Sequence, residues 1–128
     1  MSHVPVHAAN LPKPVGPYSP GMVFDRLIFV SGQGAIDPSS GQLVGNSVQL
    51  QTEQCLRNVQ TILRAAGSDL PYVLRCGVFL LDMKEFSNMN AVYSRMFGNH
   101  QPARTTIQAA GLPGEGLLVE IDCVAYVP

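Results

Sequence analysis

The sequence predicts an α+β fold in which one mixed β-sheet carries two helices on a single face. Strand-like segments outnumber helical ones, and both helical segments are amphipathic. Packing both helices on one face of the sheet buries the apolar stripe of each helix. Charged residues make up only 13% of the chain, about half of the roughly 25% that is usual. Because the other sheet face needs cover, we expect a symmetric homo-oligomer; the alternative is a monomer with a surface rich in Ser, Asn and Gln.

The size and charge of the chain restrict its class. Its 128 residues fit a single domain over residues 1–128. The net charge is −1 and the eight Lys and Arg residues form no basic cluster, so a nucleic-acid partner is not expected. No apolar stretch suits a membrane span, and no signal-peptide pattern opens the chain. Three widely spaced cysteines are typical of reduced thiols, so we expect a cytoplasmic protein, or a mitochondrial one in a eukaryote.

The first third of the chain favours short strands around a stiff segment. Strands are expected over residues 3–7, as a weak edge strand, and over residues 22–24 and 27–30, as an antiparallel hairpin. The segment GPYSPG, residues 16–21, stays extended because each proline fixes its own φ and restricts the residue before it. It therefore holds Tyr18 in a set position. The glycines of SGQG, residues 31–34, indicate a bulge or a backbone that another group approaches closely.

The rest of the chain alternates helices and strands. An apolar stripe predicts a helix over residues 47–66, with a cap at Asn46 or Ser47 and a stop at Gly67. A central strand over residues 73–81 precedes a second helix over residues 84–97. Residues 102–120 indicate strand, turn and strand. The last strand is expected over residues 117–127. Successive side chains of a strand point to opposite faces of the sheet, so one face carries Val119, Ile121, Cys123 and Ala125.

Two charged residues stand inside the final apolar strands. Arg104 and Thr106 share one face of their strand, and Glu120 lies between two aliphatic residues. The guanidinium fork matches a carboxylate, so Arg104 is suited to fix an anionic substrate. Burial would raise the pKa of Glu120 toward the range of a general base. The alternative is a structural ion pair between Arg104 and Glu120 or Asp122 across a hairpin, and spacing does not separate the two.

Four further residues are candidates for the same site, each with a structural alternative. Tyr18 can donate a hydrogen bond in a pocket or simply pack between its prolines. Ser31 and Gly32 can offer backbone groups to a small ligand or form an ordinary turn. Asn90 lies beside the apolar stripe of the second helix and can face a cleft or cap a loop. The three histidines lack metal-ligand spacing, so we expect acid–base chemistry on a small anion, without a metal or cofactor.

Several motifs together resemble one known family. They are GPYSPG at residues 16–21, IFVSGQ at 28–33, FSNMNAVY at 86–93, PARTTIQ at 102–108 and LPGEGLLVEI at 112–121. In this order and spacing they resemble the RidA/YjgF family of reactive-intermediate imine deaminases. The resemblance covers the chain from about Pro14 to Val127. The Pro-Ala-Arg motif, followed by the strand with Glu120, is its most specific part.

The resemblance implies a chorismate-mutase-like α+β fold and a homotrimer. In that assembly the sheets face inward, the helices lie outside, and three clefts form between subunits. The implied activity is hydrolysis of 2-imino acids, such as 2-iminopropanoate and 2-iminobutanoate, to 2-oxo acids and ammonia. The implied site residues are Arg104 for the substrate carboxylate, Glu120 for water and Tyr18 in the pocket.

The resemblance also assigns substrate contacts and shows two departures. Asn90 matches a helix residue at the cleft, and Ser31 and Gly32 match a loop that meets substrate through its backbone. Thr106 stands where many members have Cys, but its hydroxyl can still form a hydrogen bond to substrate, and Thr105 stands where Ser or Ala is common. These two departures therefore affect the expected substrate preference more than the expected type of reaction. Two alternatives come with the family: an endoribonuclease or translation-inhibitor activity, and a trimer that binds small carboxylates without catalysis.

Overall fold

The structure is a computed structural model that describes residues 2–128. One six-stranded sheet, ordered β1-β2-β3-β6-β4-β5, carries two helices. The strands are β1 (His3–Pro5), β2 (Gly21–Phe24), β3 (Leu27–Gln33), β4 (Val73–Leu80), β5 (Ala103–Gln108) and β6 (Val119–Tyr126); the helices are α1 (Val48–Ala65) and α2 (Phe86–Phe97), with 3₁₀ turns η1 (Leu70–Tyr72) and η2 (Met83–Glu85). The predicted order of strands and helices is confirmed.

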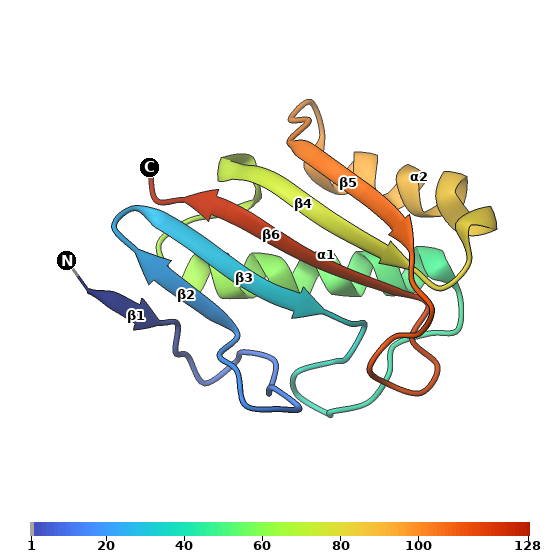
Figure 1. Ribbon diagram of the computed structural model, residues 1–128, viewed down its shortest axis with the longest axis horizontal. Helices are drawn as coiled ribbons and strands as arrows, with labels where there is room; N and C mark the ends of the chain where they lie inside the picture. The colour runs from blue at the N-terminus through green and yellow to red at the C-terminus, as the bar shows by residue number, and fades with distance from the viewer. Residues whose placement is uncertain (1) are drawn as a thin grey trace.

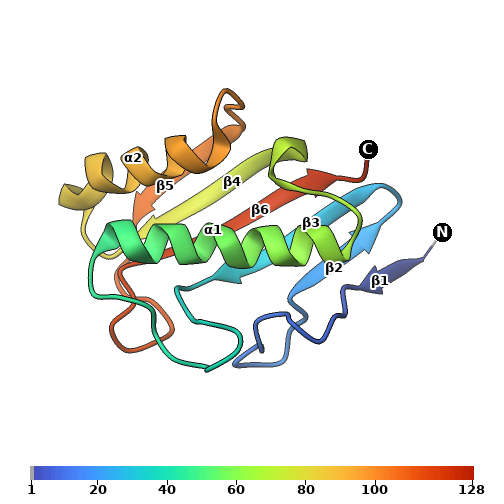
Figure 2. The same ribbon diagram turned by 180° about the vertical axis from the view of Figure 1, so that it is seen from behind.

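Both helices lie on one face of the sheet, as predicted (Figures 1 and 2). The α1 face that packs on the sheet includes Cys55, Leu56, Val59, Ile62 and Leu63, all with no exposed surface. The helix starts where predicted, because the Ser47 hydroxyl accepts a hydrogen bond from the Leu50 amide at 3.2 Å. It ends before Gly67, whose φ of 86° is the left-handed conformation that glycine adopts easily.

The start of the second helix differs from the prediction. Residues 83–85 form the 3₁₀ turn η2, so the α-helix begins at Phe86 and not at Lys84. Asp82 caps this turn, because its Oδ1 accepts a hydrogen bond from the Lys84 amide at 2.9 Å. The turn tightens the entry to α2 because a 3₁₀ turn has fewer residues per turn than an α-helix.

The predicted hairpin over residues 102–120 is wrong. Strand β5 pairs with β4 in parallel, while β6 pairs antiparallel with both β3 and β4. Strand β4 therefore lies between β5 and β6. The reason is that α2 carries the chain back from the end of β4 to its start, and a strand that follows such a crossover runs parallel to the strand before it. The loop after β5 then returns to the centre of the sheet.

Within residues 2–128, one face of the sheet has no helix over it. The alternation predicted for β6 is confirmed: Val119, Ile121, Cys123 and Ala125 are buried under the helices. The opposite face exposes large apolar side chains, which include Leu27, Phe29 and Ile107 at 38%, 46% and 45%. This is the uncovered sheet face that the low charge content predicted.

Cys55, Cys76 and Cys123 are buried and form no disulfide with one another. Across the described residues, neither helix has the length and apolar character needed to cross a membrane.

Candidate functional site

The residues expected to form one site lie in two separate places within the chain. Tyr18, Gly32 and Glu120 line a pocket at one end of β3 and β6. Asn90 and Arg104 line a second pocket between α2 and the edge strand β5. We call these the carboxylate half-site and the arginine half-site.

Strand register places Arg104 and Glu120 on opposite faces of the sheet. Cys76 of β4 pairs with Arg104 on one side and with Cys123 on the other. Directly paired residues share a face, so Arg104 lies on the helix side with the buried Cys123. Glu120 is three residues from Cys123 along β6, which turns its side chain to the open face. The alternative of a structural Arg104–Glu120 ion pair is therefore wrong, and Asp122, which shares the face of Glu120, is excluded in the same way.

Arg104 is held by aromatic rings and not by an acid. Its Cζ atom lies 4.7 Å from the ring centroid of Tyr93 and 5.6 Å from that of Phe86. Its Nη1 atom is 4.0 Å from the Met89 sulfur. Among residues 2–128 no carboxylate forms an ion pair with it; the three ion pairs there involve Arg57, Arg64 and Arg95. A half-buried guanidinium with free N–H groups is suited to bind an anion.

The arginine half-site also contains two polar atoms without partners. The Oδ1 atom of Asn90 and the hydroxyl of Tyr93 are buried and accept or donate no hydrogen bond within residues 2–128. Buried polar atoms are nearly always paired, so the unpaired Asn90 Oδ1 acceptor suits a ligand N–H group or an ordered water. Thr106 is half-buried on the same face of β5, two residues beyond Arg104, but does not line this pocket.

Cys76, the thiol that pairs with Arg104 in the register of the sheet, is not a reactive group of the arginine half-site. Cys76 is the register partner of Arg104 and has no exposed surface. Burial raises the pKa of the Cys76 thiol to about 11, against smaller opposing effects of Tyr93 and Arg104. A neutral buried thiol is inert as a nucleophile.

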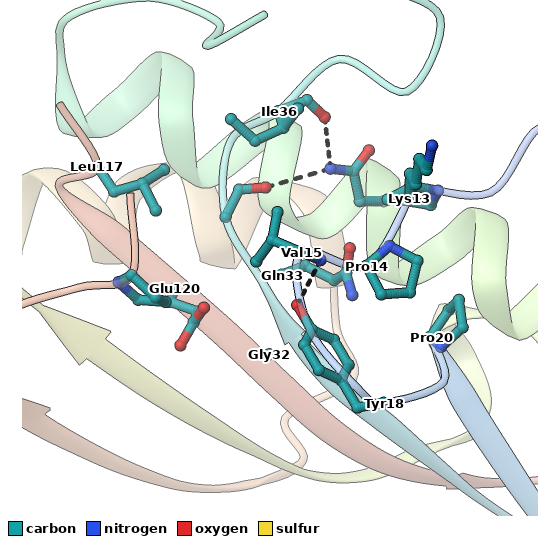
Figure 3. Close-up of a pocket in the computed structure, with 14 residues that line it drawn as sticks. Lys13, Pro14, Val15, Tyr18, Pro20, Gly32, Gln33, Ile36, Leu117 and Glu120 are labelled. Atoms are coloured by element: carbon teal, nitrogen blue, oxygen red, sulfur yellow. Dashed lines mark hydrogen bonds between the residues drawn. The ribbon is translucent and has the colours of Figure 1, made fainter. Parts of the chain in front are cut away.

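The carboxylate half-site places Glu120 beside apolar groups and Tyr18. Figure 3 shows Glu120 and the ring of Tyr18 on either side of Gly32, with Val15 above the ring. Burial raises the pKa of the Glu120 carboxyl, and the negative charge of Asp122 adds to this. Arg104 has no part in the shift, because it lies on the other face. A carboxyl with a raised pKa is a better proton acceptor than an ordinary surface glutamate.

Gly32 allows the close approach of Glu120. The register between β3 and β6 shifts between Val30 and Gln33, so Gly32 stands in the bulge that the sequence suggested. A methyl group on its Cα would lie 2.9 Å from both Cδ and Oε2 of Glu120. No side chain fits there unless the carboxylate moves.

Replacing this glycine is expected to impair the site without unfolding the chain. In Gly32→Ala the new methyl group displaces the Glu120 carboxylate, and a misplaced reacting group costs about 100-fold in rate. Measurement of kcat for imine hydrolysis, the activity that the sequence resemblance implies, checks this. Gly111→Ala is the matched control, because a methyl group at Gly111 meets nothing within 4 Å. Equal rates for the two variants would show that the contact between Gly32 and Glu120 has no part in catalysis.

Ser31 uses its backbone groups inside the chain. Its amide donates to the Pro20 carbonyl at 2.9 Å, its hydroxyl to the Ser19 carbonyl at 2.7 Å, and its carbonyl accepts from Gln33 Nε2 at 3.0 Å. The Ser31 carbonyl oxygen keeps a second lone pair, so the expected backbone contact of Ser31 with substrate stays a prediction. Within the chain, Ser31 ties the GPYSPG segment to β3. In that segment the Tyr18 hydroxyl accepts from the Val15 amide at 3.3 Å, which fixes the ring.

Tyr93 and Phe86 are site residues that the sequence alone did not show. Both lie in the apolar stripe of α2, and that stripe predicts only core packing. Their contact with Arg104 arises because α2 lies over the edge strand β5, a tertiary arrangement without a local signal. Across residues 2–128, no group of three or more His, Cys, Asp or Glu side chains is placed to hold a metal ion.

The fold and the site define a class: small α+β proteins whose sheet separates a half-buried arginine, without an acid partner among residues 2–128, from a half-buried carboxylate. A model of the family described as endoribonuclease L-PSP matches residues 8–127. The chain belongs to this family, the RidA/YjgF family that its motifs resemble.

Individual relatives agree with this assignment. A RutC family protein of Pyrococcus horikoshii is 40% identical over 121 residues, 94% of this chain and 95% of that protein. The human protein named 2-iminobutanoate/2-iminopropanoate deaminase is 42% identical over 120 residues, 94% of this chain and 87% of that protein. The crystal structure of the Escherichia coli YjgF gene product, 31% identical, gives a TM-score of 0.91 over 98% of this chain and 99% of that one. The predicted family and fold are confirmed.

Proposed function

We propose that the protein hydrolyses 2-imino acids such as 2-iminobutanoate and 2-iminopropanoate to 2-oxo acids and ammonia. The observation that carries this proposal is the half-buried Arg104, which faces a pocket and has no acid partner among residues 2–128. Such a group selects a small carboxylate. The name of the human relative supports the imino-acid class.

The proposed active site is completed by a second copy of the chain. Because Arg104 and Glu120 lie on opposite faces of one sheet, no single copy brings both to one substrate. We propose a homotrimer in which the arginine half-site of one copy meets the carboxylate half-site of the next. The exposed apolar residues Leu27, Phe29 and Ile107 support burial of the open sheet face in such an assembly.

In the proposed reaction, Arg104 binds the carboxylate of the protonated imine. Asn90 Oδ1 accepts a hydrogen bond from the imine nitrogen, and Tyr18 and the Gly32 backbone border the substrate. Glu120 takes a proton from water as the water oxygen bonds to C2, which gives a carbinolamine. Glu120 then returns the proton to the amine nitrogen. The C–N bond breaks as the hydroxyl becomes the carbonyl, and the hydroxyl proton leaves with ammonia as ammonium.

This chemistry is within reach of the groups in the two half-sites. Protonated imines hydrolyse without a catalyst, so orientation and one acid–base group supply the gain, and we propose no cofactor. The raised pKa of Glu120 suits the return of the proton. The three buried, unpaired cysteines suit a reducing compartment, so we propose that the protein acts in the cytoplasm.

The test is the rate at which 2-iminobutanoate decays with and without the protein. An amino-acid oxidase acting on 2-aminobutanoate generates the imine, and the appearance of 2-oxobutanoate is followed. We expect the rate to rise in proportion to protein concentration. Binding of 2-oxobutanoate without faster imine decay would contradict catalysis and favour a carboxylate-binding trimer. Cleavage of RNA without imine hydrolysis would favour the endoribonuclease activity in the family description.

A further inference from the structure

The side chain of Tyr93 connects helix α2 to Arg104. Its ring centroid lies 4.7 Å from the guanidinium carbon, and the residue is only 8% exposed. Phe86 is farther from this carbon, at 5.6 Å, and is 38% exposed. Tyr93 is thus the nearer and the more deeply buried of the two rings against Arg104.

We propose that Tyr93 is a positioning residue, which holds the Arg104 guanidinium in the orientation that binds the substrate carboxylate. The inference rests on the proposed function, since it concerns the same anion. It assigns the role to the face of the ring and not to the hydroxyl.

An aromatic ring suits this role better than a carboxylate partner of Arg104 would. An arginine side chain has many rotamers, and fixing it before the ligand binds lowers the entropy lost on binding. A carboxylate partner would fix it but would occupy the N–H groups that the substrate needs. An aromatic ring attracts the cation through its face and leaves the N–H groups at the guanidinium edge free. Tyr93 therefore orders Arg104 without competing for its hydrogen bonds.

The hydroxyl of Tyr93 is a poor candidate for the role. It is buried and makes no hydrogen bond within residues 2–128. It lies beside the Cys76 thiol without the geometry of a hydrogen bond, and burial raises the pKa of Tyr93, so the phenol stays neutral. The substitution Tyr93→Phe, which removes this oxygen, therefore breaks no hydrogen bond among residues 2–128.

Neighbouring residues provide a matched control. Phe97 lies in the same stripe of α2, is also 8% exposed, and stacks on Tyr93 with ring centroids 4.7 Å apart. It makes no cation–π contact with Arg104 among the described residues. Phe97→Leu therefore removes a buried aromatic ring from the same place without removing the ring that faces the guanidinium.

The experiment measures the Kd of 2-oxobutanoate by calorimetry, together with KM and kcat for 2-iminobutanoate. For Tyr93→Leu we expect Kd and KM to rise about 10-fold, the scale of a half-buried cation–π contact. We expect kcat to change much less, because Arg104 binds the carboxylate equally in the bound substrate and in the transition state, and losing such binding raises KM without lowering kcat. Tyr93→Phe keeps the ring and should stay within about 2-fold of the wild type in all three. Phe97→Leu should keep its Kd while its melting temperature falls about as far as that of Tyr93→Leu.

Several outcomes would overturn the inference. One is a Kd of Tyr93→Leu for 2-oxobutanoate that equals the wild-type Kd. Another is a Kd of Tyr93→Phe as high as that of Tyr93→Leu. A third is a rise in Kd for Phe97→Leu as large as that for Tyr93→Leu. If Tyr93→Leu does not fold, Tyr93→Met takes its place and is judged by the same values. A wild type that binds 2-oxobutanoate but hydrolyses no imine overturns the proposed function, and the Kd series still decides the role of Tyr93. A wild type that does not bind 2-oxobutanoate overturns both.

Discussion

The variant Arg104→Ala is expected to lose about 100-fold or more in kcat/KM for 2-iminobutanoate, because charged hydrogen bonds to a carboxylate contribute about 1.5–3 kcal/mol each. It should stay folded, since Arg104 makes no ion pair among residues 2–128 and its main contacts are with two aromatic rings. Steady-state kinetics in the oxidase-coupled assay and a thermal melt check the two parts.

Two further variants make this test specific. Arg104→Lys keeps the charge but loses the planar fork, so we expect it to lie between Arg104→Ala and the wild type. Arg57→Ala is the control, because it removes an arginine that is 59% exposed and pairs with Glu53 on the surface of α1. It should keep full activity, since exposed ion pairs contribute about 0–1 kcal/mol. Full activity in Arg104→Ala would end the proposal that this residue binds the substrate.

A mixture of two inactive variants is expected to recover activity. Glu120→Gln keeps the size of the side chain but cannot take a proton, so we expect about a 100-fold lower kcat. When Arg104→Ala and Glu120→Gln chains are unfolded and refolded together, some neighbouring copies supply an intact Arg104 and an intact Glu120. In random trimers with sites between neighbours, about a quarter of the sites are intact, so about a quarter of wild-type activity should return.

The control for this mixture uses a double variant. Arg104→Ala refolded with the chain that carries both Arg104→Ala and Glu120→Gln contains no intact Arg104, so its activity should stay at the background. If the first mixture also stays at the background, while size-exclusion chromatography shows mixed trimers, the site does not combine Arg104 and Glu120 of different copies. Such a result would contradict the arrangement inferred from the opposite faces of the sheet.

The chain itself contains most of the information on the elements of the fold. The periodicity of α1 and the alternation of β6 each predict a local structure that is found, because these signals act between near neighbours. The extended form predicted for residues 16–21 is wrong: the chain bends over residues 15–18, where the Tyr18 amide donates to the Gly16 carbonyl at 2.9 Å and closes a tight turn. The low charge content also predicted the open apolar face, because a chain with few charged residues has too little polar surface to cover a monomer. The motifs around Arg104 and Glu120 identified the family.

The pairing of the strands was not predictable from local signals. The segments around Arg104 and Glu120 are close in sequence and separated by a glycine-rich turn, which is the ordinary pattern of a hairpin. The crossover through α2 places β5 beside β4 instead, and β4 keeps β5 apart from β6. That one difference separates Arg104 from Glu120 and excludes the ion pair.

The sequence by itself determined the family, the helices and strands, and the residues that carry charge into the sheet. Only the tertiary structure decided what those residues face. The contact of Arg104 with Tyr93, the approach of Glu120 to Gly32, and the use of the Ser31 backbone within the chain all join elements that are distant in sequence. The physical reason is that local periodicity fixes on which side of its own strand a residue lies, whereas strand order and helix placement fix its neighbours.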